Sequence, residues 1–261
     1  MRILLNADDF GFSPDTVDAT IDCLRSGAIL GATIMPKMPA TAAALDFARS
    51  RPDLSFGVHL TFGGDGIEAP LSPPADVRDM VGPDGRFLQS NRVRWRAVFG
   101  QIAPDQIDRE LTAQLQFIFD AGIRPSHVDS HGHLHKFAPF RRALARALPR
   151  FGIARVRSAQ DIYLRKPLRS PNYWIGPWWR RQLRKRFRTT DHFYMPASAW
   201  DRAWPDALIR DVLPRLPGAT LEVGVHPGRE EAWRADEAAD VRRFALAARE
   251  AGHELIGWRD L

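Results

Sequence analysis

Two adjacent acids lie near the N-terminus, directly after a short apolar run. Asp8 and Asp9 follow Ile3-Leu4-Leu5, within the stretch Asn6-Ala7-Asp8-Asp9-Phe10-Gly11. Aspartate is depleted in strands and is costly to bury without a partner. The pair therefore needs cations, hydrogen bonds or a metal ion, although capping a helix is an equally ordinary use for such acids.

Histidines occur at three further apolar runs, within Gly57–Leu60, Asp129–His135 and Gly224–Gly228. A lone histidine in an apolar strand is more often a satisfied core residue than a ligand. In the second run, however, every other residue from 131 to 135 is histidine, so in an extended segment the three would share a face. Acids and histidines at the ends of four separate runs indicate one metal-centred site assembled from several strands.

The residue types fit metal-assisted hydrolysis. Such sites use imidazole and carboxylate ligands and leave one position for water, and Asp9, His59 and His131 could form this set. Asp8 could then act as general base, and His226 could protonate a leaving amine. The other isolated histidines lack this context and are interpreted as structural: His127, His192 and His253.

Short apolar runs alternate with helical patterns along the chain. The expected helices cover residues 13–25, with Ser13 as N-cap and Pro14 at the first position, 105–121 and 236–251. The expected strands are Ile3–Asn6, Gly31–Met35, Ser55–Leu60, His127–Ser130, Ala154–Arg157, Thr220–His226 and Glu254–Trp258.

This alternation predicts an α/β fold, an irregular (β/α) barrel with long inserted loops, in a single domain covering residues 1–261. The active site of such a barrel lies at the carboxyl ends of its strands, where the acids and histidines are expected. A flat doubly wound sheet is the alternative. It more often carries a glycine-rich phosphate loop after the first strand, where this chain has the two acids.

Composition bounds the class of protein. Hydrophobic residues make up 44% and charged residues 26% of the 261 residues, as in ordinary globular proteins. No apolar run approaches the about 18 residues of a membrane span, and the N-terminus lacks a signal-peptide pattern. We therefore expect a cytoplasmic location. Cys23 is the only cysteine, which excludes an internal disulfide, and we expect it to be a buried, inert thiol.

Two segments do not fit the alternation, residues 63–101 and 163–204. The second combines five tryptophans with a run of six basic residues between Arg180 and Arg188. Tryptophan with a basic cluster suits a phosphate-bearing substrate or peripheral contact with an anionic membrane, and a solvated basic helix is the ordinary alternative. The net charge is +6, yet no nucleic-acid-binding module accompanies the cluster, so we expect no nucleic acid partner.

The chain resembles the YdjC-like carbohydrate deacetylases, the group that contains chitooligosaccharide deacetylase. The resemblance rests on four segments that occur in the same order: Asn6–Gly11, Gly57–Leu60, His127–His135 and Val223–Gly228. It implies an irregular (β/α) barrel and metal-dependent removal of an N-acetyl group from an amino sugar.

By position, Asp9, His59 and His131 match the metal ligands of that family. Asp8 matches the first member of its acid pair, and His226 matches its late histidine. The resemblance implies one divalent metal ion and an N-acetylated sugar as substrate. The ligand types favour zinc or magnesium, with manganese or cobalt as alternatives. The tryptophans and arginines of residues 163–204 leave open whether the sugar is an oligosaccharide or is lipid-linked or nucleotide-linked. A homodimer is left open.

Two other functions compete with this interpretation. The same metal site could belong to another barrel hydrolase such as a phosphoesterase. A non-catalytic carbohydrate-binding relative would have no reason to retain all of the acids and histidines. Release of acetate or of phosphate, and metal content, distinguish the three.

Overall fold

The computed structural model describes residues 1–64, 66–196 and 203–261. Its strands are β1 (Arg2–Phe10), β2 (Gly31–Ile34), β3 (Ser55–Leu60), β4 (Val128–Ser130), β5 (His192–Tyr194), β6 (Thr220–Val225) and β7 (Glu254–Leu255). Its helices are α1 (Pro14–Arg25), α2 (Thr41–Ser50), α3 (Ser90–Val98), α4 (Pro104–Asp120), α5 (Ala138–Ala147), α6 (Pro171–Arg184), α7 (Trp204–Ala207) and α8 (Ala232–Glu250). No helix among the described residues is long and apolar enough to cross a membrane.

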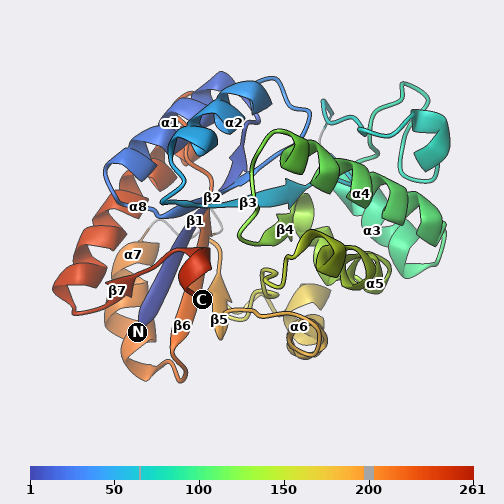
Figure 1. The fold of residues 1–261 in the computed structure, drawn as a ribbon. Helices are drawn as coiled ribbons and strands as arrows, with labels where there is room; N and C mark the ends of the chain where they lie inside the picture. Colours follow the sequence, from blue (N-terminus) through green and yellow to red (C-terminus); the bar gives the residue numbers. More distant parts are fainter. Residues whose placement is uncertain (65, 197–202) are drawn as a thin grey trace.

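The strands form one parallel sheet in the order β4-β3-β2-β1-β6-β5, and β7 pairs with the start of β1. The first strand thus lies between the second and the sixth. Val128, in β4, forms a bridge with Val156. The neighbouring Arg155 forms a bridge with Arg188, which precedes β5. These bridges bring the two edges of the sheet toward each other, so the sheet curls into an incompletely closed barrel (Figure 1). The predicted barrel is confirmed, and the flat doubly wound alternative is wrong.

Helices cover the outside of the curled sheet. Helices α1, α2 and α8 pack along one flank, and α4 and α5 pair on another (Figure 1). Helix α1 begins as predicted, because the Ser13 side chain accepts a hydrogen bond from the amide of Thr16 and Pro14 occupies the first turn. The core consists of strand residues such as Ile3, Val58 and Val223, which are fully buried between sheet and helices.

The strands at residues 154–157 and 254–258 are shorter than predicted. The first contributes only the bridges at Arg155 and Val156. The segment 163–204, predicted to lie outside the alternation, contains α6 and also β5, which extends the sheet beside β6. Three residues give too little periodicity to reveal such a strand.

Candidate metal centre

The two acids after the first strand both reach the carboxyl end of the barrel because the strand is irregular there. In a regular strand adjacent side chains point to opposite faces. Here the pairing of β1 with β2 shifts between Ala7 and Phe10, and Asp9 adopts a left-handed conformation with φ 58°. Such a conformation costs roughly 1–2 kcal/mol. The local strain thus accompanies the placement of both carboxylates in one site.

Asp9 lies beside both histidines that the sequence assigns to the metal. Its Oδ1 atom is 3.4 Å from His59 Nε2 and 3.5 Å from His131 Nδ1. Asp9 Oδ2 accepts a hydrogen bond from Arg234 at 2.9 Å, whereas Oδ1 is buried and makes no hydrogen bond among the described residues. Burial opposes ionisation, but the adjacent His131, followed by the charge of His226, holds the pKa of Asp9 well below its usual value.

These three residues fit a divalent metal ion. One atom from each of Asp9, His59 and His131 can be chosen so that all lie within 4.8 Å of one another. A buried carboxylate oxygen without a hydrogen-bond donor, facing two imidazole nitrogens, is costly unless a cation is bound. Asp8, His59 and Asp129 form a second group of this kind. There, however, every carboxylate oxygen already has a polar partner, whereas Asp9 binds Arg234 through Oδ2 alone and leaves Oδ1 facing the imidazoles. The first group therefore fits a metal better.

His59 is held by a carboxylate on its other side. Its Nδ1 atom is 2.8 Å from Asp129 Oδ1, in β4, and 3.3 Å from the hydroxyl of Thr33, in β2. An Nδ1–H donated to Asp129 leaves Nε2 unprotonated and directed toward Asp9. A carboxylate in this position fixes the tautomer and the ring orientation of a metal-binding histidine.

His131 is the most exposed of the three, and a turn separates it from the two histidines that follow. Gly132 and His133 adopt φ angles of 60° and 55°, within a 3₁₀ turn over His131–Lys136. His135 turns back to the Ser130 hydroxyl at 2.8 Å, and His133 packs against Phe193. The segment is not extended, so the prediction of one shared face was wrong.

Arg157 organises the acids of the site and was not predicted. It is fully buried and binds Asp8 through two hydrogen bonds of 2.5 and 2.7 Å. It also contacts Asp129 at 2.6 Å and Glu222 at 2.7 Å. Burial opposes its charge, yet these three acids raise the pKa of Arg157 well above its usual value. One sequence signal existed, because Glu222 interrupts an otherwise apolar strand and requires a buried partner.

Asp8 and His226 face each other with opposite protonation. Burial would raise the pKa of Asp8, but Arg157 lowers it to about 2. Burial would lower the pKa of His226, but Glu237, followed by Asp9 and Asp8, raises it to about 9. His226 Nε2 is 3.9 Å from Asp8 Oδ2, and its amide donates to Glu237 at 2.7 Å. At neutral pH the site therefore holds a carboxylate beside an imidazolium.

The long segment 63–101 also reaches the site. Glu68 is buried, and its Oε1 atom is 3.9 Å from His131 Nε2. Its Oε2 atom accepts hydrogen bonds from the amides of Gly66 and Ile67, which fix the carboxylate. Sequence reasoning missed Glu68 because an acid in a proline- and glycine-rich loop carries no periodic signal.

The basic, tryptophan-rich segment divides into buried and exposed parts. Arg180 and Arg184 both donate to the carbonyl of Asp191, so these arginines hold the loop before β5. Trp179 and Trp204 are buried, and Trp174 and Trp178 are exposed. Trp200 lies outside the described residues. The remaining structural predictions agree: Cys23 is buried, His127 stacks on Trp258, and His192 binds Asp161.

Comparison with known proteins identifies the family. Residues 2–256 match the family of YdjC-like proteins. The chain belongs to this family. Proteins named carbohydrate deacetylase are similar to it: that of Vibrio vulnificus CMCP6 is 30% identical over 87% of this chain and 78% of the relative. That of Geobacillus stearothermophilus is 37% identical, but over only 51% of this chain and 50% of the relative.

A solved structure supports the fold. A proposed cellobiose-phosphate cleavage protein from Enterococcus faecalis V583 superposes with a TM-score of 0.77. The match covers 99% of this YdjC-like chain and 98% of the other, at 22% sequence identity. At this sequence identity the likeness is one of fold.

Proposed function

We propose that this YdjC-like protein is a metal-dependent hydrolase that removes the N-acetyl group from an amino sugar. The observation that carries the proposal is the position of the buried Asp9 Oδ1 atom, 3.4 Å from His59 Nε2 and 3.5 Å from His131 Nδ1. The names of the similar relatives support the carbohydrate deacetylase class.

Asp9, His59 and His131 would hold one divalent metal ion. Two imidazole nitrogens and one carboxylate favour zinc, and magnesium, manganese or cobalt are alternatives. When bound, such an ion lowers the pKa of a water ligand and polarises a carbonyl oxygen.

Asp8 would accept the proton of the attacking water. Arg157 holds both of its oxygens, which fixes the carboxylate and keeps it ionised. The same contact makes Asp8 a weaker base, because its pKa is about 2. Asp8 is therefore ionised at neutral pH and available to accept a proton.

His226 would supply a proton to the nitrogen of the departing amine. With a pKa raised to about 9, its ring is protonated at neutral pH. It lies next to Asp8 and is about one-fifth exposed, so a substrate can reach it. Two neighbouring groups whose pKa values are pushed in opposite directions are suited to the base and acid roles of one reaction.

Acetate release from a panel of N-acetylated sugars tests the proposal. Metal-stripped protein should be inactive, and zinc or another divalent ion should restore turnover. His131→Asn should lose metal binding and activity. His133→Asn is the matched control, because its ring packs against Phe193 and asparagine tolerates the same backbone conformation. Acetate release without metal, or release of phosphate instead, would contradict the proposal.

A further inference from the structure

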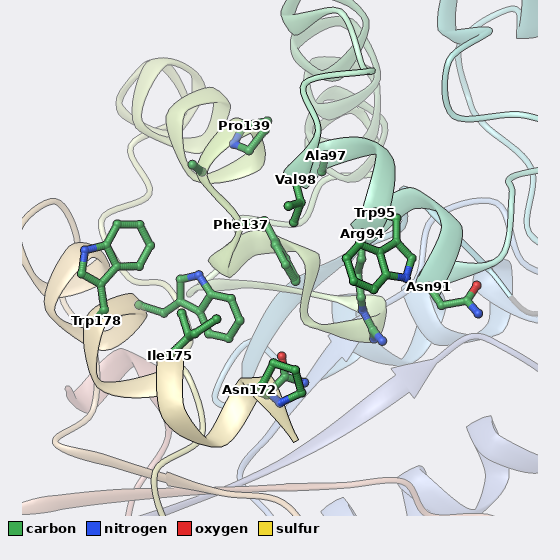
Figure 2. A pocket seen from close by; sticks show the side chains of 13 residues that line it. Asn91, Arg94, Trp95, Ala97, Val98, Phe137, Pro139, Asn172, Ile175 and Trp178 are labelled. Atoms are coloured by element: carbon green, nitrogen blue, oxygen red, sulfur yellow. The ribbon is translucent and has the colours of Figure 1, made fainter. Parts of the chain in front are cut away.

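An apolar groove runs between α3 and α6, beside the candidate metal centre. It has a volume of about 540 Å³, within the range of small-ligand pockets, about 300–1,000 Å³. Figure 2 shows Trp95 and Val98 on α3, and Ile175 and Trp178 on α6, among the side chains that line the groove. These four side chains are 42–62% exposed. So much apolar surface on two facing helices is unusual unless something binds there.

The groove adjoins a polar pocket beside His131. That second pocket, of about 410 Å³, is lined by His131 and Gly132 and by the polar residues Gln89 and Ser90. Asn91 and Arg94 line both cavities. Arg94 also donates to the carbonyl of Gly132 at 2.7 Å, so α3 is tied to the turn that carries His131. The apolar groove therefore has a fixed position relative to the site of chemistry.

We infer that the groove binds an apolar aglycone of the amino-sugar substrate, such as an alkyl or prenyl chain. The inference rests on the proposed function. The polar pocket beside His131 suits a sugar ring, and the adjoining groove suits a hydrocarbon chain attached to it. A membrane surface fits less well, because the apolar side chains face one another across a concavity rather than projecting together.

A series of N-acetylglucosamine glycosides with methyl, butyl and octyl chains tests the inference, below the micelle concentration. A buried methylene is worth up to about fourfold in affinity, so kcat/KM should rise at least about tenfold from methyl to octyl. Ile175→Asp and Val98→Asp should abolish this increase and leave the methyl glycoside unaffected. Leu246→Asp, an equally exposed aliphatic position on α8, is the matched control and should retain the increase.

Binding of octyl glucoside, measured by calorimetry, separates this inference from the proposed function because this sugar has no N-acetyl group. Wild type and Leu246→Asp should bind octyl glucoside more tightly than methyl glucoside, and Ile175→Asp should not. Equal binding of the two glucosides, or acetate release independent of chain length, would overturn the inference while leaving deacetylation intact. Loss of binding to phosphatidylcholine vesicles in Ile175→Asp, without any chain-length effect, would instead assign the groove to a membrane surface.

Discussion

Asp129 should control metal affinity although it is not one of the proposed ligands. Its carboxylate lies 2.8 Å from His59 Nδ1, and this contact directs His59 Nε2 toward Asp9. Asn at this position keeps the size of the side chain but removes the charge that selects the tautomer. We therefore predict that Asp129→Asn weakens metal binding by about 10–100-fold.

The effect can be expressed as metal-dependent stability. At a free metal concentration 100 times the dissociation constant, binding stabilises the folded wild type by about 2.7 kcal/mol. If the variant binds 100-fold more weakly, the same concentration equals its dissociation constant and the stabilisation falls to about 0.4 kcal/mol. A tenfold weakening would leave about 1.4 kcal/mol.

Urea unfolding of metal-stripped protein, with and without zinc at one fixed concentration, measures this quantity. Asp129 also binds Arg157, so the variant should lose stability without metal as well. The difference between the two curves isolates the metal contribution. Asp161→Asn is the matched control, because Asp161 contacts His192 Nδ1 and Arg180, both at 2.7 Å. If Asp129→Asn and wild type gain the same stability from zinc, the proposed role of Asp129 is wrong.

Three further predictions concern the proton-transfer groups, one for Asp8 and two for His226. Asp8→Asn should retain metal, measured by metal analysis, but lose about 10²–10⁴-fold in kcat, because an amide cannot accept a proton; unchanged kcat would assign the base elsewhere. His226 has a pKa raised from 6.5 to about 9, so wild-type kcat/KM should fall above about pH 9 and His226→Gln should be slower without that alkaline decline. Because the pKa is raised, the pairing of His226 with Glu237 stabilises the fold fully below about pH 6.5, and this stabilisation is lost as the pH rises through about 9. Between pH 7 and 10, the wild type should therefore lose more unfolding free energy than His226→Gln. Equal losses would argue against a charged His226.

The ends of the strands were predictable because their side chains break an apolar pattern. Asp9, His59 and His131 each follow or end such a run, and the parallel sheet brings these ends together. The residues that orient them were not predictable in the same way. Arg157 and Glu222 act through a contact between segments distant in sequence, and Glu68 enters from a segment without periodicity. The turn at Gly132 was not predictable either, because the alternating histidines suggest an extended segment.

Arg157 has a consequence for how the protein folds. Its guanidinium joins β1 through Asp8 and β6 through Glu222, partners 149 and 65 residues away in the sequence, and it also binds Asp129 in β4. A buried charge with only some of its partners in place is strongly unfavourable. If the three strands closed around Arg157 one at a time, the intermediate states would bear this unfavourable free energy. Contacts between residues so distant in sequence also form slowly. Closure of the barrel and assembly of the proton-transfer pair should thus be a single cooperative event, so a partly folded chain would carry no working centre.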